Sequence, residues 1–120
     1  PPELRIPEQY RTFCKENGIE YHEYEDMNSI LAESDILYMT RVQQERFTDP
    51  MEYEKVRNTY SLHNALLEGT KDNLRILHPL PRITEIAEDV DNNPKAYYFE
   101  QAKNGVYARQ AVICSILGLV

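Results

Sequence analysis

An apolar run that ends in Pro-Leu-Pro is the feature that most restricts how this chain can fold. Leu74–Leu77 has the length and composition of a strand, and His78 and a proline-rich turn follow it. Pro79 and Pro81 each lack a backbone N–H and fix φ, so neither a helix nor a central strand can continue through them. The carbonyls of Pro79 and Leu80 therefore lack ladder partners and could accept hydrogen bonds from a ligand. A tight structural turn explains the same residues, and Leu80–Pro81 is a candidate cis bond in either case.

The composition argues against several classes of protein. The 120 residues are enough for one domain with a modest core. A net charge of −7 argues against a nucleic-acid surface, which needs clustered Lys and Arg. No apolar run approaches the roughly 18 residues that a membrane span requires. Cys14 and Cys114 belong to no Cys-x-x-Cys or Cys/His cluster, so we expect reduced thiols, no metal site and a cytoplasmic location.

Helix and strand signals alternate as far as residue 77. Pro7 precedes an apolar stripe at helical spacing, Asp26 can cap a short helix, and Asp49-Pro50-Met51-Glu52 begins a helix that we expect to end near Asn58. Strands are predicted over residues 19–24, 34–39 and 74–77. Strands separated by helices are typical of parallel sheets. We therefore predict an α/β fold, a partial Rossmann-like domain with an open parallel sheet and helices on both faces.

A long helix is predicted at the C-terminal end of the chain. Asp91-Asn92-Asn93-Pro94 is a helix-start signal, and apolar residues then recur at helical spacing as far as Leu117. Gly105 interrupts this pattern and predicts a close packing contact or a bend. A helix this long on so small a domain suggests docking onto another domain. We expect a partial domain over residues 1–93, the helix over 94–120, and further strands from a segment before residue 1.

Two polar segments leave predicted strands at the same edge of the sheet. Thr40–Arg46 follows the second predicted strand, and His78–Arg82 follows the third. Ligands of open α/β sheets bind outside the carboxyl ends of the strands. Arg41, Arg46 and Arg82 would therefore form a local positive site in an acidic chain.

The residue types at this edge suit a small anion. An arginine fork binds a carboxylate with two hydrogen bonds, and Gln43 adds a neutral donor and acceptor. A di- or tricarboxylate is the simplest ligand that fits. Arg41 and Glu45 are equally well explained as a solvated i,i+4 ion pair, which contributes little.

Both segments closely resemble aspartate carbamoyltransferase catalytic chains. The resemblance is carried by Tyr-Met-Thr-Arg-Val-Gln-Gln-Glu-Arg-Phe at 38–47 and by His-Pro-Leu-Pro-Arg at 78–82. It continues through Glu85-Ile86-Ala87 and the segment 98–109, so it covers essentially the whole sequence in order. It corresponds to the C-terminal, aspartate-binding part of those chains. The related ornithine carbamoyltransferases typically have Cys where this chain has Pro79, and they lack the Thr-Arg-Val-Gln stretch.

The resemblance implies a reaction and a role for each site residue. The family transfers the carbamoyl group of carbamoyl phosphate to the amino group of L-aspartate, giving N-carbamoyl-L-aspartate and phosphate in pyrimidine biosynthesis, with no metal or organic cofactor. By similarity, Arg41 and Gln43 bind the aspartate carboxylates. The carbonyls of Pro79 and Leu80 hold the amino group of carbamoyl phosphate. Glu45 orients Arg41 when the site closes, and residues 44–53 form the mobile loop.

The remaining residues at this edge have supporting roles under the resemblance, and no catalytic acid or base is expected in this part. His78 is interpreted as a packed, hydrogen-bonded turn residue, and Pro81 as the cis proline. Arg82 either contacts substrate or holds the loop through a carboxylate such as Glu85. Arg109, on the terminal helix, is interpreted as an interdomain ion-pair partner.

The family also implies partners. Its Ser-x-Arg-Thr phosphate motif is absent from this chain, because it belongs to an N-terminal carbamoyl-phosphate domain, and active sites form between the chains of a homotrimer. We therefore expect this chain alone to be inactive, with no nucleic-acid or membrane partner. Whether regulatory chains join the trimer stays open. So does the alternative that the chain is a non-catalytic fragment or scaffold domain that binds a partner chain.

Overall fold

The fold is taken from a computed structural model, which describes residues 5–57 and 59–119, apart from the side chain of Arg46. The sheet is open and parallel, with two strands, β1 (Ile36–Tyr38) and β2 (Arg75–Leu77), paired so that Leu37 lies opposite Ile76. Two of the predicted strands, at 34–39 and 74–77, are thus confirmed within shorter bounds.

β2 is paired on both of its sides. On the side of β2 that faces away from β1, the Ile76 N–H donates to Lys95 O (2.8 Å), and the Tyr97 N–H donates to Ile76 O (2.9 Å). These bonds form a parallel bridge between Ile76 and Ala96. A second isolated bridge joins Leu62 to Ile86. The backbone of Ile76 is therefore the point at which three separate segments of the chain meet.

The prediction of a strand over residues 19–24 is wrong. These residues follow helix α1 (Glu8–Glu16) in an irregular conformation, and Ile19, Tyr21 and Tyr24 are exposed. Alternating apolar residues specify a strand only where another strand can pair with them. Within residues 5–57 and 59–119, no backbone ladder reaches this segment.

The helices follow their sequence signals closely where a local cap defines them. The Asp49 Oδ1 atom accepts a hydrogen bond from the Met51 N–H (2.8 Å), with Pro50 at the first helical position. The remaining helices and 3-10 helices after α1 are α2 (Asn28–Leu31), η2 (Gln44–Arg46), α3 (Pro50–Val56), η3 (Asn64–Leu67), η4 (Glu88–Val90) and α4 (Tyr98–Ile116). The end that we predicted for α3, Asn58, lies outside the described residues. The predicted class, an α/β fold with an open parallel sheet and a long C-terminal helix, is confirmed.

The long helix begins later than its sequence signal indicates. We expected it from Pro94, but α4 starts at Tyr98. Asn93 closes a local turn instead, because its Oδ1 atom accepts from the Lys95 N–H (2.9 Å), and the next residues pair with β2. Inside α4, the Arg109 guanidinium folds back onto the helix and donates to the Gly105 carbonyl (2.9 Å), where a Cβ atom would lie 2.8 Å from that guanidinium. The close contact expected at Gly105 is therefore made within the helix.

The core lies on one side of this small sheet. Leu37 and Ile76 point into it, and Tyr98 at the start of α4 closes it with no exposed surface. The opposite side of β1 leaves Ile36 63% exposed. The buried cluster consists of Leu31, Leu37, Met39, Leu62, Leu67, Leu74, Ile76, Ile86, Val90 and Tyr98.

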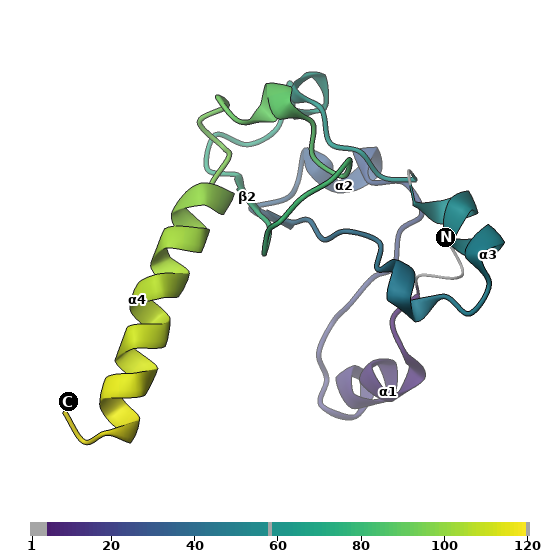
Figure 1. Ribbon diagram of the computed structural model, residues 1–120. Helices are drawn as coiled ribbons and strands as arrows, with labels where there is room; N and C mark the ends of the chain where they lie inside the picture. Colours follow the sequence, from purple (N-terminus) through teal and green to yellow (C-terminus); the bar gives the residue numbers. More distant parts are fainter. Residues whose placement is uncertain (1–4, 58, 120) are drawn as a thin grey trace.

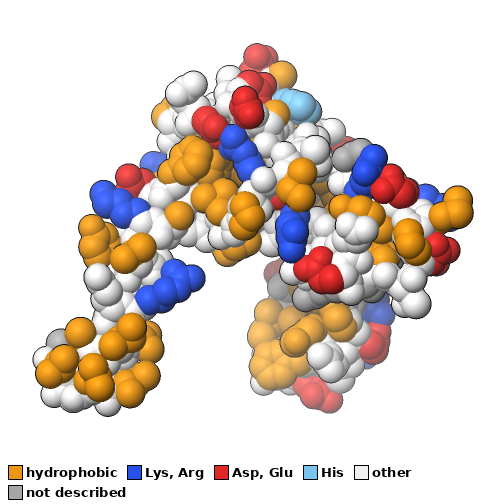
Figure 2. Space-filling model, viewed as in Figure 1, with side chains coloured by type: hydrophobic (Ala, Val, Ile, Leu, Met, Phe, Trp, Pro, Cys, Tyr) orange, Lys and Arg blue, Asp and Glu red, His pale blue; other side chains and the backbone are white. Residues whose placement is uncertain are grey.

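The molecule is more extended than a compact domain of its length. Its radius of gyration is 17.1 Å, whereas a compact chain of this length would have about 14 Å. Figure 1 shows the reason: α4 runs away from the sheet and ends far from it, and α1 also stands apart. Apolar side chains gather at the far end of α4 (Figure 2), where Ile116 is 79% exposed. No helix among the described residues is long and apolar enough to cross a membrane.

Alanine substitutions on the two sides of the sheet should differ strongly in their effect on stability. Ile76→Ala should lower the free energy of unfolding by about 3 kcal/mol, because it leaves a cavity in a fully buried site. Ile36→Ala, on the exposed side of β1, should change it by less than about 1 kcal/mol. Urea denaturation of the two variants tests this. Equal losses would contradict the placement of the core.

Candidate functional site

The parallel pairing brings the two predicted site segments to one edge of the sheet. Tyr38 lies opposite Leu77 in the register, and the Met39 N–H donates to Leu77 O (2.8 Å). Both strands therefore end together, so Thr40–Gln43 and His78–Arg82 both begin at the carboxyl edge. This is the arrangement that the sequence predicted, and it is where open α/β sheets bind ligands.

Arg41 and Glu45 form an ion pair at this edge. An Arg41 Nη atom lies 3.1 Å from Glu45 Oε1, and the two side chains are 43% and 59% exposed. Gln43 is half-buried and immediately precedes η2, the short 3-10 helix that contains Glu45. A pair this exposed contributes little to stability. It leaves most of the guanidinium donors of Arg41 available to another carboxylate.

The proline turn carries two free carbonyls. The Leu80–Pro81 bond is cis, as predicted, and Leu80 has a φ of 52°. Few non-glycine residues adopt this left-handed conformation, and those that do cluster at functional sites. Across residues 5–57 and 59–119, no donor pairs with the carbonyl of Pro79 or of Leu80. The turn can therefore present two acceptors to a ligand.

His78 sits beneath this turn and is almost fully buried. Its Nδ1 atom accepts a hydrogen bond from the Leu80 N–H (2.8 Å), and its Nε2 atom lies 2.8 Å from Glu85 Oε1. The backbone N–H of His78 donates to Gln101 Oε1 (2.9 Å). The interpretation of His78 as a packed, hydrogen-bonded turn residue is thus confirmed.

Arg82 is held by a carboxylate, but not by the one we named. Its guanidinium binds both oxygens of Asp91 and also contacts the Tyr98 hydroxyl (3.1 Å). The expected contact with a carboxylate is thus present, but the partner is Asp91 and not Glu85, which we gave as an example. The Glu85 carboxylate is occupied by His78 and by the N–H groups of Ile83 and Thr84.

The contacts around Arg82 shift the pKa values of its partners. The Arg82 hydrogen bonds lower the pKa of Asp91. Burial, and then the hydrogen bond to Asp91, raise the pKa of Tyr98 to about 12. The lowered pKa of Asp91 and the raised pKa of Tyr98 indicate a charged Arg82–Asp91 pair beside a neutral Tyr98 hydroxyl. Arg82 in this arrangement joins the turn to the start of α4.

Gln101 is a connection that sequence reasoning missed. From α4, its side chain accepts from the His78 N–H and donates to the Tyr38 hydroxyl (3.1 Å). It therefore joins the ends of both strands. Its partners lie 23 and 63 positions away, and no local spacing rule reaches that far.

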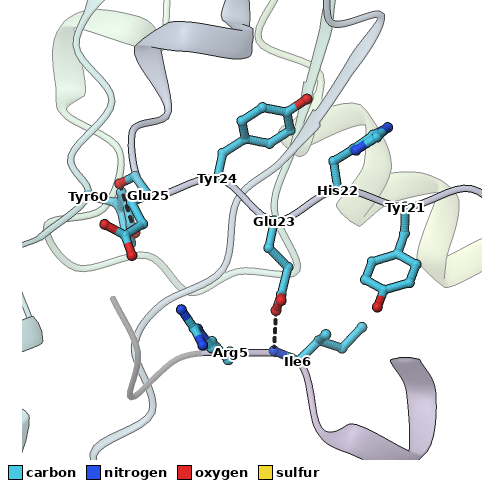
Figure 3. Close-up of a pocket in the computed structure, with 8 residues that line it drawn as sticks. All are labelled: Arg5, Ile6, Tyr21, His22, Glu23, Tyr24, Glu25 and Tyr60. Atoms are coloured by element: carbon cyan, nitrogen blue, oxygen red, sulfur yellow. Dashed lines mark hydrogen bonds between the residues drawn. The ribbon is translucent and has the colours of Figure 1, made fainter. Parts of the chain in front are cut away.

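Two hollows lie beside the predicted site segments, and neither is lined by Arg41 or by the proline turn. One of about 390 Å³ is shown in Figure 3, where the Ile6 N–H donates to Glu23 (3.2 Å). Its wall mixes Arg5 with Glu23 and Glu25, which does not suit an anion. A neighbouring hollow of about 330 Å³ includes Tyr38, Met39 and Thr40 in its wall, just before Arg41.

A comparison of the sequence with known protein families shows which family has this sheet edge. Residues 1–116 match the family described as aspartate/ornithine carbamoyltransferase, Asp/Orn binding domain. The chain belongs to the aspartate/ornithine carbamoyltransferase family. The resemblance inferred from Tyr38–Phe47 and His78–Arg82 is therefore confirmed.

Individual carbamoyltransferases give the same result. The chain is 63% identical to the aspartate carbamoyltransferase catalytic subunit of Phocaeicola vulgatus, over 99% of this chain and 38% of that protein. It superimposes on the catalytic subunit of M. jannaschii aspartate transcarbamoylase with a TM-score of 0.86 and 39% identity, covering 100% of this chain and 40% of the other. Aspartate transcarbamoylase from Trypanosoma cruzi, in complex with carbamoyl phosphate and aspartate, has a TM-score of 0.77 and 30% identity over 88% of this chain and 35% of its own. The chain thus spans about two fifths of the length of these relatives.

The Arg82–Asp91 pair predicts a pH-dependent stability. The pKa of Asp91 is lower in the folded chain than the ordinary value of about 3.9. The pair therefore stabilises fully above that value, and its contribution is lost as pH falls through the folded pKa. Asp91→Asn should cost about 2 kcal/mol at pH 7 and flatten the acid limb of the stability curve. Asp72→Asn, at an exposed position, is the control for urea denaturation, and matching acid limbs in the two variants would contradict the prediction.

Proposed function

We propose that this chain is the aspartate-binding part of an aspartate carbamoyltransferase. The enzyme would transfer the carbamoyl group of carbamoyl phosphate to the amino group of L-aspartate, giving N-carbamoyl-L-aspartate and phosphate, in the cytoplasm and for pyrimidine biosynthesis. The observation that carries the proposal is one sheet edge that holds both a partly free guanidinium and two carbonyls without a hydrogen-bond donor among the described residues. The names of the relatives favour aspartate over ornithine as the acceptor.

Arg41 and Gln43 would bind the carboxylates of aspartate. Arg41 is a local positive charge on a chain of net charge −7, so it selects an anionic acceptor. The contact with Glu45 supports a role for that carboxylate in fixing the direction of the guanidinium. Residues 44–53 contain η2 and the first turn of α3, and we propose that they close over bound aspartate.

The carbonyls of Pro79 and Leu80 would hold the amino group of carbamoyl phosphate. Two acceptors on a rigid turn suit the two N–H bonds of a carbamoyl group. Fixed there, the carbamoyl carbon can be attacked by the aspartate nitrogen. A C–N bond then forms, the C–O bond to phosphate breaks, phosphate leaves with that electron pair, and the nitrogen loses a proton. Positioning of the two substrates would supply most of the rate enhancement, with no cofactor.

The rest of the site would come from an N-terminal carbamoyl-phosphate domain and from neighbouring chains in a homotrimer. We divide the chain into a partial aspartate domain over 1–93 and a terminal segment over 94–120 that packs on that other domain. The exposed apolar residues of α4 support this division, because surfaces of this kind mark contact sites. They are Phe99, Val106, Tyr107, Val112, Ile113 and Ile116, and Leu117 directly after the helix is exposed as well.

Arg41 gives the direct test of the aspartate site. In the assembled enzyme, Arg41→Ala should raise the KM for aspartate about thirtyfold, the equivalent of losing about 2 kcal/mol from a charged hydrogen bond. Arg75→Ala, at the amino end of β2, should leave the KM unchanged. Steady-state kinetics at saturating carbamoyl phosphate measure both variants. Unchanged aspartate kinetics in Arg41→Ala would show that the acceptor binds elsewhere.

Co-expression tests the function itself. This chain, produced with an N-terminal carbamoyl-phosphate domain, should form carbamoylaspartate from aspartate and carbamoyl phosphate while ornithine stays inert. The chain alone should show no turnover. Ile116→Asp should prevent assembly, whereas Gln110→Asp places the same charge on α4 at a polar position and should not. An assembled complex that is inactive with both acceptors would favour the scaffold role instead.

A further inference from the structure

The buried imidazole of His78 is hydrogen-bonded to the backbone of the proline turn. His78 is 1% exposed, and both of its ring nitrogens have partners: the Leu80 N–H at Nδ1 and Glu85 Oε1 at Nε2, each at 2.8 Å. An N–H donor can bond only to an unprotonated nitrogen. Nδ1 is therefore the acceptor, and Nε2 carries the proton that is donated to Glu85.

Glu85 is itself fixed in place. Its second oxygen accepts hydrogen bonds from the N–H groups of Ile83 and Thr84, both at 3.1 Å. Burial raises the pKa of this carboxyl, but the backbone N–H groups and His78 lower it by more, so the net shift is downward. A charged Glu85 accepts a hydrogen bond from the Nε2–H group and so selects the tautomer that leaves Nδ1 free to accept from Leu80.

Leu80 needs such a support. Its φ of 52° lies in the left-handed region, which is unfavourable for a leucine unless its surroundings hold it there. Its N–H belongs to the peptide unit whose carbonyl is that of Pro79. The hydrogen bond to His78 Nδ1 therefore fixes the plane of that peptide and the direction of the Pro79 carbonyl.

We propose that His78 is a positioning residue for carbamoyl phosphate, which acts through Leu80 and is itself oriented by Glu85. The imidazole does not touch the substrate. It sets the peptide plane between Pro79 and Leu80, so that the Pro79 carbonyl is aimed before the ligand arrives. This inference rests on the proposed function, which assigns that carbonyl to the carbamoyl amino group.

Two substitutions of His78 separate its two hydrogen bonds. In His78→Asn, the side-chain Oδ1 atom takes the place of Nδ1 and can still accept from Leu80, but the bond to Glu85 is lost. In His78→Gln, the amide nitrogen takes the place of Nε2 and keeps the bond to Glu85, but the acceptor for Leu80 is lost. The assembled enzyme, with saturating aspartate, is used for both.

The inference predicts unequal effects on carbamoyl phosphate. The KM for carbamoyl phosphate should rise about tenfold in His78→Gln and by less than about threefold in His78→Asn. A purely structural role would reduce the folded fraction, which lowers the apparent kcat and leaves the KM unchanged. Thermal unfolding of both variants measures that fraction separately.

The outcomes are distinguishable from failure of the function itself. Wild-type enzyme without carbamoylaspartate formation overturns the proposed function and this inference with it. Active wild type, with both variants keeping the wild-type KM or raising it equally, overturns the role of His78 alone. If His78→Gln does not assemble, His78→Asn decides: a KM within threefold supports the inference, and a larger rise overturns it.

Discussion

The backbone pairing of Ile76 is the interaction on which the rest of the structure depends. Its strand accepts β1 on one side and residues 95–97 on the other, and its side chain is fully buried in the core. The first pairing makes Tyr38 and Leu77 end together, which places Arg41 and the proline turn at one edge. The second fixes where α4 begins, and with it the position of Tyr98. A single strand thus sets the location of every candidate site residue.

The start of α4 is joined to the site by side chains as well as by backbone. Arg82 reaches Asp91 and Tyr98, while Gln101 reaches His78 and Tyr38. A displacement of α4 would therefore move side chains that are hydrogen-bonded to the ends of both strands. In an enzyme whose α4 packs on a second domain, this connection would link domain contact to the geometry of the proline turn.

Local signals in the sequence predicted the features that local chemistry decides. The cis bond at Leu80–Pro81 and the Asp49 cap followed from proline geometry and capping. The parallel order of β1 and β2 followed from the alternation of helix and strand signals along the chain. The strand predicted over residues 19–24 did not form because no described strand pairs with this segment. The start of α4 was placed four residues early because Ala96 pairs with the distant Ile76. Long-range pairs of this kind leave no pattern in a single sequence.

The most direct test of the account is a crystal structure of the assembled enzyme with carbamoyl phosphate and succinate, a dicarboxylate that lacks the attacking amine. The account predicts the carbamoyl nitrogen within hydrogen-bond distance of the Pro79 and Leu80 carbonyls, and a succinate carboxylate on Arg41 and Gln43. A carbamoyl group bound away from the proline turn, or a succinate that contacts neither Arg41 nor Gln43, would contradict it.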